Sequence, residues 1–409
     1  MKSLKRATRL QALSGLAAVI AIATIMTWPN RRDGGQVSAQ GNDPPNRVVF
    51  LHYDYMVAPD HSHAPDPRAI QIVVEAFRRH GITLHIDPVH TAIPEKKVIT
   101  LQPVNPSCAG PDAVDIHELR ATYFQPHGNH TWHYAVFGHR VNCPDPDHCF
   151  ACSRDSVCGG LPDPGSTGGA ELPGQNFVVA FGPYIDEGQP VPLSLETTVF
   201  MHELGHNLGL RHGGTDACVN QKPNYISVMN YTYLLNGIPV GNAPGSTSFR
   251  TCTTEAECGP PTVATGTCAT PNACHCTDDL VPVLGSNICY RADYSDQELP
   301  TLNELVPSPG LGGLDENLGV SGGPDDTDLV LYFVSGPSQL VGPSYGPINW
   351  NNNDGFTEHV QADINNDGTF TLLTGFNDWA YVHAFLNTPE YRNGIVRQNP
   401  TAISCGTGR

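Results

Sequence analysis

The spacing of apolar and polar residues along the chain changes twice between residues 47 and 87. Residues 47–55 read RVVFLHYDY and predict a strand, because β-branched and aromatic residues dominate them. The segment from Arg68 to His80 carries apolar residues at helical spacing, and Pro67 and Gly81 mark its start and its end. Residues 83–87 predict a second, short strand. A strand, a helix and a strand in this order predict an α/β lobe with a right-handed crossover.

Two further strands and a second helix are predicted before the middle of the chain. Residues 132–141 and 176–184 predict the strands, and residues 142–175 between them are rich in Gly, Pro and Cys. Residues 194–209 predict the helix, for which Ser194 is a suitable N-cap. The helical period is set by Leu195, Val199, His202 and His206, and Gly209 ends the helix.

Beyond about residue 214 the periodicity weakens and turn residues dominate. A strand at residues 329–334 and a short helix at residues 378–386 are the elements predicted there. The chain therefore divides into a first part with mixed helices and strands and a second, more irregular part.

The composition indicates a globular, loop-rich protein. Hydrophobic residues make up 39% of the 409 residues and charged residues only 15%, with 41 glycines and 36 prolines. The formal net charge is −18, and such an acidic surface would repel the phosphates of a nucleic acid. We therefore expect no nucleic-acid partner, and we expect a monomer.

Residues 1–39 have the layout of a signal peptide. A basic segment precedes an uncharged run from Leu10 to Trp28, and small residues at 37–39 offer a cleavage site. We therefore expect a secreted or otherwise extracytoplasmic protein. The uncharged run is also about long enough to span a bilayer, so an uncleaved anchor that tethers the chain to the cell surface is the alternative. A membrane is expected as a partner only in that case. The basic residues are Lys2, Lys5, Arg6 and Arg9.

Thirteen cysteines in an exported protein predict a disulfide framework. Most of them fall into two clusters, at residues 143–158 and 252–289. The pair Cys149 and Cys152 has the spacing of half a zinc knuckle, but disulfides are favoured in an oxidising compartment. The odd count leaves one thiol free or paired in another way.

The segment HELGHNLGLRH at residues 202–212 contains the candidate metal-binding and catalytic residues. Residues four apart on a helix share one face, so His202 and His206 can bind one ion. Gly209 lets the chain leave the helix and bring His212 round as a third ligand. Three protein ligands leave a fourth position open, which is typical of a catalytic zinc. Glu203 can then act as general base toward a water at the metal.

This segment resembles the long zinc signature of the metzincin metallopeptidases, HExxHxxGxxH followed by a Met-turn. The resemblance assigns the Met-turn to Met229, in the segment YISVMNY at residues 225–231. Tyr231 is similar to the tyrosine that astacins and serralysins place near the metal, where it stabilises the transition state. A tyrosine that only packs near the turn is the alternative. The cysteine-rich insertions resemble those of pappalysins, so the branch of the family stays open.

The resemblance implies an α+β, two-lobed catalytic domain. A mixed twisted sheet and two long helices would lie above the zinc, with an irregular, disulfide-rich lobe below it. The expected division is an upper catalytic subdomain at residues 40–213 and a lower subdomain at residues 214–409. The family's lowest strand binds substrate by β-augmentation. Residues 176–184 are the expected edge strand, because they form the last predicted strand before the active-site helix.

A second ion site is expected near the C-terminus. Asp363, Asn365 and Asp367, followed by Gly368, match the first half of a calcium-binding loop, although Thr374 replaces the glutamate expected at the twelfth position. The whole stretch 349–368 is rich in Asn and Asp and could equally form polar turns.

Several other histidines do not match a metal-binding motif. His61 and His63 lie in a Pro-rich loop, and four more crowd residues 127–139. Without a nearby carboxylate or a regular spacing, we expect surface histidines rather than a second metal site. The four are His127, His130, His133 and His139.

The sequence thus predicts a secreted zinc endopeptidase that acts on proteins or peptides, with Zn²⁺ as its ion and Ca²⁺ as a candidate second ion. The alternative is a secreted binding or adhesion protein with a structural zinc site and disulfide-rich modules. Glu203 separates the two, because a purely structural site does not need that carboxylate.

Overall fold

The structure is a computed structural model of the 409-residue chain. All of the residues that it describes belong to the unit Pro44–Arg409. The predicted signal segment, most of both cysteine clusters and the last seventeen residues lie outside the description. None of the described helices is long and apolar enough to cross a membrane. The described residues are 47–101, 112–128, 130–141, 167–215, 219–249, 280–282 (backbone only), 289–305, 313–334, 336, 338–353, 355–357 and 359–392.

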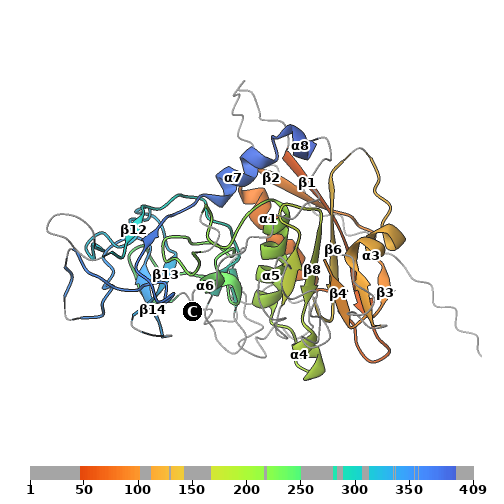
Figure 1. The fold of residues 1–409 in the computed structure, drawn as a ribbon, viewed down its shortest axis with the longest axis horizontal. Coiled ribbons are helices and arrows are strands. Elements are labelled where there is room, and N and C mark those ends of the chain that lie inside the picture. Colours follow the sequence, from red (N-terminus) through yellow and green to blue (C-terminus); the bar gives the residue numbers. More distant parts are fainter. Residues whose placement is uncertain are drawn as a thin grey trace, which may run out of the picture. The chain divides into compact units, whose positions relative to one another are not determined.

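A six-stranded mixed sheet organises the first part of the chain (Figure 1). Its strands follow the order β2-β1-β6-β8-β7, and β3 also pairs with β1. All of the pairs are parallel except β7 with β8, which is antiparallel. The strands are β1 (Arg47–Val57), β2 (Ile82–Ile86), β3 (Ala92–Pro94), β6 (Trp132–Gly138), β7 (Gly168–Ala170) and β8 (Asn176–Ala180).

Both faces of this sheet are covered, which explains why every residue of β6 and β8 is buried. One face packs against α1 (Pro67–Arg79) and α5 (Leu193–Asn207), through alternate residues such as Phe137 and Val179. The intervening residues, such as Val136, face a second core that includes Ile116 and Leu119 of α3. The elements at this side are β4 (Val98–Thr100), β5 (Ala113–Asp115) and α3 (Ile116–Tyr123). Helix α4 (Gly182–Asp186) follows β8, and its Tyr184 packs against the first core.

Most of the predicted elements are confirmed, and three of their details are wrong. The strand predicted at residues 132–141 ends at Gly138. The strand predicted at residues 176–184 ends at Ala180, and α4 follows it, because Gly182 and Pro183 begin a helical turn. Ser194 is not the N-cap of the helix predicted at residues 194–209, which begins at Leu193 directly after Pro192. The carbonyl of Ser194 instead accepts a hydrogen bond from the hydroxyl of Thr198 (3.0 Å).

The second part of the chain consists of short strands around a separate core. Trp350, Tyr233, Ile348 and Ile364 are buried at its centre. The predicted strand at 329–334 is confirmed as β13. The elements are α6 (Tyr231–Leu234), β9 (Ile238–Pro239), β10 (Leu280–Pro282), β11 (Cys289–Arg291), β12 (Leu302–Asn303), β13 (Leu329–Phe333), β14 (Gln339–Pro343) and β15 (Leu372–Leu373).

The last helices return to the first part of the chain. The helix predicted at 378–386 is α7 (Asp378–Phe385), and it is followed by α8 (Pro389–Arg392). Figure 1 shows both helices, in blue, beside α1, β1 and β2. Trp379 packs edge-on against Phe77 of α1, and the carbonyl of Tyr391 accepts a hydrogen bond from Thr131 (2.7 Å).

The described residues therefore form a mixed α and β fold with a mixed sheet, in keeping with the predicted α+β class. The disulfide-rich character of the lower lobe stays a prediction. Among the cysteines only Cys289 is described, and it is disulfide-bonded.

Candidate metal centre and active site

Helix α5 carries the first two predicted zinc ligands on one face. The Nε2 atoms of His202 and His206 are 3.0 Å apart, and Nε2 of His206 is 2.9 Å from Nε2 of His212. Three nitrogens bound tetrahedrally to one zinc at 2.0–2.1 Å would lie about 3.3 Å apart. The three rings thus converge on one point at nearly the separation that a zinc ion requires, and together they form a group able to hold a metal.

The outer nitrogens of two rings fix which nitrogen faces the centre. Nδ1 of His202 donates to the carbonyl of Val228 (2.8 Å), and Nδ1 of His206 donates to the carbonyl of Leu210 (2.9 Å). A carbonyl only accepts, so the proton of each neutral ring sits on Nδ1 and the lone pair of Nε2 points inward. Burial lowers the pKa of all three histidines, that of His206 to about 4. Neutral rings with inward lone pairs fit a cation at their centre.

Gly209 makes the turn that brings His212 into this group. Its φ is +92°, in the left-handed region that favours glycine. A Cβ atom there would stand 2.8 Å from the hydroxyl oxygen of Tyr381. The amide of Gly209 donates to the carbonyl of His206 (2.8 Å), which closes the last turn of the helix.

Glu203 is buried beside the histidine group, and one of its oxygens has no hydrogen-bond partner among the described residues. Its exposed fraction is 6%, and among the described residues no group hydrogen-bonds to its Oε2 atom. Burial raises the pKa of this carboxyl well above its ordinary value. An orphaned carboxylate is costly in a protein interior, and water at a nearby cation would relieve that cost. The unpaired oxygen therefore fits the general base of a zinc site.

The predicted Met-turn lies directly under α5. A Cβ atom at Gly205, between the first two ligands, would stand 2.5 Å from the sulfur of Met229, which is fully buried. The carbonyl of the preceding residue, Val228, is the one that orients His202. The turn therefore supports the site through a sulfur contact and through a backbone hydrogen bond.

Helix α7 holds the Met-turn in place. Asp378 accepts hydrogen bonds from the hydroxyls of Ser227 (2.5 Å) and Tyr225 (2.8 Å), and the amide of Met229 donates to Ser227 Oγ (3.1 Å). All four residues are buried. Asp378 could not be identified from the sequence, because it lies 149 positions after Met229. Gly205 was not identified either, although a glycine inside a predicted helix is a visible sign of close packing.

Tyr231 lies beside the candidate metal ligands at the start of α6. Its ring centre is 4.3 Å from that of His212 and 6.1 Å from that of His202, and 49% of the residue is exposed. Its half-exposed ring therefore lies next to the histidine group.

The prediction that residues 176–184 form the edge strand of the sheet is wrong. β8 lies between β6 and β7, so among the described strands the short β7 is the last one of the sheet. β7 also passes over the site, because a Cβ atom at Gly168 would stand 2.4 Å from Oε1 of Glu203. The sequence Gly-Gly-Ala has no apolar alternation and was not recognised as a strand.

The predicted calcium ligands form a polar turn. Asp363 accepts hydrogen bonds from the amides of Asp367 (3.2 Å) and Gly368 (3.0 Å), one on each of its oxygens. Asn365 donates to Asp367 (3.0 Å). These bonds account for the Asn/Asp/Gly composition, and calcium binding here stays a prediction.

Three of the histidines that were expected at the surface are buried. His133 lies in the core between Asn207 and Tyr391. His63 and His139 lie with His61 and Glu95 in a second group whose ligand atoms are all within 4.8 Å of one another. His127 and His130 are exposed, as expected.

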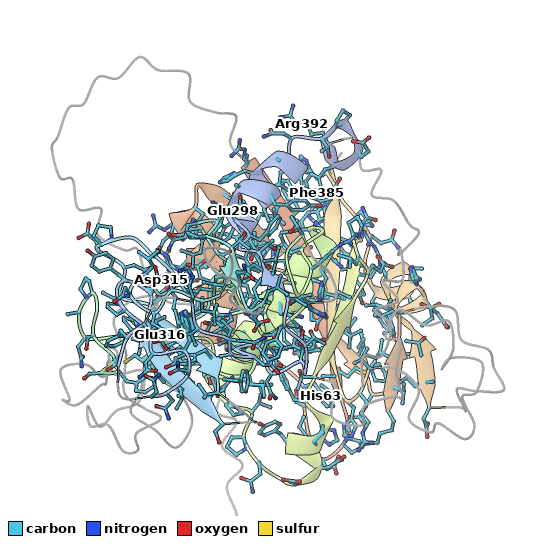
Figure 2. The ribbon with its side chains drawn as sticks, turned by 60° about the vertical axis from the view of Figure 1, so that its left-hand side comes forward. His63, Glu298, Asp315, Glu316, Phe385 and Arg392 are labelled. Carbon is cyan, nitrogen blue, oxygen red and sulfur yellow. The ribbon has the colours of Figure 1, made fainter. Side chains whose placement is uncertain are left out.

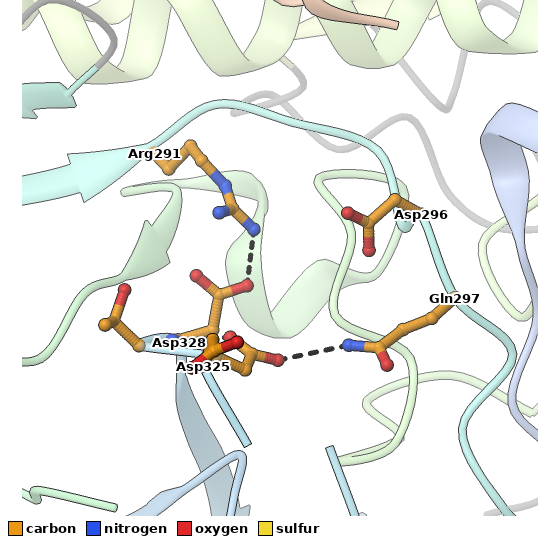
Figure 3. A pocket seen from close by; sticks show the side chains of 7 residues that line it. Arg291, Asp296, Gln297, Asp325 and Asp328 are labelled. Carbon is orange, nitrogen blue, oxygen red and sulfur yellow. Dashed lines mark hydrogen bonds and ion pairs between the residues drawn. The ribbon is translucent and has the colours of Figure 1, made fainter. Parts of the chain in front are cut away.

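A separate acidic pocket of about 380 Å³ lies in the second part of the chain (Figure 3). Arg291 pairs with Asp328 there, and Gln297 donates to Asp326 (3.1 Å). None of the residues that line this pocket is a predicted site residue. The other lining residues are Asp296, Asp325 and Thr327.

Comparisons with known proteins add little to this geometry. No family model matches the chain, and no curated protein matches it. Among solved structures, the chain is similar to an archaemetzincin from Methanopyrus kandleri, at 16% identity and a TM-score of 0.27. The match covers 46% of this chain and 83% of that one. A likeness this low carries no weight for the fold or the function.

Proposed function

We propose that this protein is a zinc-dependent endopeptidase. The convergence of Nε2 atoms from His202, His206 and His212, beside the unpaired carboxylate of Glu203, carries the proposal. Three protein ligands leave the fourth position of a tetrahedral zinc open, whereas structural zinc sites are closed by a fourth protein ligand. This open position, together with the adjacent base, supports hydrolysis over a purely structural role.

Each residue of the site has its own role in the proposed reaction. The three histidines hold the ion, which when bound would lower the pKa of a water molecule and polarise the scissile carbonyl. Glu203 accepts a proton from the attacking water and returns it to the leaving amine. The hydroxyl of Tyr231, whose ring lies beside His212, donates to the oxyanion of the tetrahedral intermediate.

The end strand β7 is the proposed docking edge for an extended peptide. A peptide that adds to β7 would continue the sheet and would pass Glu203, which lies against Gly168. We propose protein or peptide substrates on this basis. We also propose that the protein is a monomer and that it acts outside the cytoplasm. The layout of residues 1–39 and the disulfide at Cys289 support the location outside the cytoplasm.

The alternative is a secreted binding protein that uses the same zinc only for its structure. Mass spectrometry of a peptide library incubated with the full chain separates the two. We expect new termini that arise by hydrolysis inside the peptides, that vanish when 1,10-phenanthroline removes zinc, and that return when zinc is added. A zinc-loaded chain that leaves every peptide intact would support the binding protein.

A further inference from the structure

Three histidines and one glutamate meet beyond the carboxyl ends of the parallel strands β1 and β6. His61 and His63 follow β1, His139 follows β6, and Glu95 follows β3 directly. The ring centres of the histidines are 5.0–5.8 Å from one another. Figure 2 shows His63 at the end of the molecule where α4 lies. Carboxyl ends of parallel strands are a common place for ligand sites.

One carboxylate oxygen is the common neighbour of all three rings. Oε2 of Glu95 is 2.5 Å from Nε2 of His61, 2.9 Å from Nε2 of His63 and 3.9 Å from Nδ1 of His139. The other oxygen, Oε1, pairs with the ammonium of Lys97 (2.7 Å). Four ligand atoms on a tetrahedral zinc would be separated by about 3.3 Å, which lies within this spread.

Carboxylates on the outer side of the group lie next to two of the rings. Oδ1 of Asp186 on α4 pairs with Nε2 of His139 (3.2 Å), and Oδ1 of Asp60 lies 2.9 Å from Nδ1 of His61. A carboxylate only accepts, so the pair with Asp186 favours a proton on Nε2 of His139. His61 has a carboxylate oxygen beside each of its nitrogens, from Asp60 and from Glu95. Carboxylates in this position commonly orient metal-bound histidines.

His139 distinguishes a metal site from a hydrogen-bonded cluster. With its proton on Nε2, its Nδ1 carries a lone pair that points toward the lone pairs of Glu95 Oε2. This Nδ1 is buried and has no hydrogen-bond partner among the described residues. Two acceptors that face each other repel, and a cation between them turns the repulsion into attraction. Hydrogen bonds between Glu95 and the rings of His61 and His63 would not explain why the ring of His139 also faces this carboxylate.

We propose that His61, His63, Glu95 and His139 form a second zinc site with a structural role. Imidazole and carboxylate ligands suit zinc, and four protein ligands close the coordination sphere. The ion would tie the loop after β1 to the segments after β3 and β6. The group shares no residue with the first site. His63 lines a cavity with Glu196, which precedes His202 by six residues, or roughly 9 Å along α5.

The test uses the full chain with the first site disabled. His206→Gln should bind one equivalent of Co²⁺ with the visible absorption of a tetrahedral complex, and zinc should displace it. The same chain should show a higher Tm with zinc than without it. A chain that gives no cobalt absorption and no zinc-dependent Tm would overturn the proposal and would leave an ion-free hydrogen-bonded cluster.

Metal content supplies a second measurement, on the chain with the first site intact. His63→Gln should hold one zinc equivalent fewer than the wild type, and the matched control His127→Gln, at an exposed histidine, should lose none. If the endopeptidase proposal fails because the first site holds no zinc, the wild type will hold one equivalent, which His63→Gln still loses. Equal metal content in His63→Gln and in the wild type would contradict the second site.

Discussion

Gly168 lies so close to Glu203 that a Cβ atom at residue 168 would stand 2.4 Å from Oε1 of the carboxylate. The end strand of the sheet and the proposed general base are therefore in direct contact. Only a residue without a side chain leaves Glu203 in the position that it occupies. The contact makes the position of the base dependent on a strand that the peptide substrate would also bind.

Gly168→Ala should lower kcat by displacing the carboxylate of Glu203, while zinc stays bound. The matched control is Gly169→Ala on the same strand, where the added methyl would meet side-chain methyls of Val141 and Leu101 at 3.0–3.1 Å and not Glu203. Steady-state kinetics and zinc content of the two variants make the comparison. If both variants kept wild-type kcat, Gly168 would not constrain the base.

Gly205→Ala should overpack the space between α5 and the Met-turn. The new methyl would lie 2.5 Å from the sulfur of Met229 and 3.0 Å from the hydroxyl oxygen of Tyr294. Overpacking costs about 1–3 kcal/mol, whereas alanine gains about 1 kcal/mol over glycine in a helix. We expect a net loss of about 1 kcal/mol in urea unfolding and weaker zinc binding. Adding Met229→Ala should recover part of the zinc affinity, and no recovery would mean that the sulfur is not the obstacle.

Asp378→Ala should destabilise the Met-turn from a distance. The change removes the acceptor of the buried Ser227 hydroxyl and one of the two acceptors of the Tyr225 hydroxyl, which also lies 3.2 Å from the carbonyl of Arg211. Leaving a buried donor unsatisfied costs about 1–3 kcal/mol. We expect a loss of about 1–3 kcal/mol in unfolding free energy and faster release of zinc. Asp378→Asn keeps one acceptor oxygen and should lose less. Equal losses in both variants would argue against the hydrogen bonds as the cause.

The pair His117 and Glu171 should make stability depend on pH. The hydrogen bond to Glu171 (2.8 Å) raises the pKa of His117 from 6.5 to about 9. A raised histidine pKa stabilises the fold fully below about pH 6.5, and the contribution is lost as the pH rises through about 9. Because His117 is about half exposed, we expect no more than about 1 kcal/mol. The difference in urea midpoint between wild type and His117→Gln should shrink from pH 6 to pH 10, and a constant difference would contradict the assignment.

The elements with a strong local pattern could be predicted from the sequence. β1, α1 and α5 carry regular apolar periods, and turn or cap residues bound them, so the predicted limits agree with the structure within two residues. The histidine ligands were predictable for the same reason, because helical spacing and one glycine determine which side chains can meet. β7 has no such pattern, since two of its three residues are glycines.

Contacts between distant segments could not be predicted. Asp378 reaches the Met-turn only because α7 packs back on α1 through Trp379. Glu95 joins His61 and His139 because three strands of the sheet end side by side, and the register of those strands is set by the whole core. The histidines at 61 and 139 were therefore expected at the surface, and their carboxylate partner was not identified.

The most direct test of the first site compares Glu203→Gln and His206→Gln with the wild type for zinc content and for the initial rate of peptide cleavage. A general base typically increases the rate of the catalysed reaction about 10²–10⁴-fold. We expect Glu203→Gln to keep its zinc at the first site and to lose at least about 100-fold in rate, and His206→Gln to lose both that zinc and the activity. If Glu203→Gln, fully loaded with zinc, cleaved peptides at the wild-type rate, Glu203 would not be the base and the proposed mechanism would be wrong.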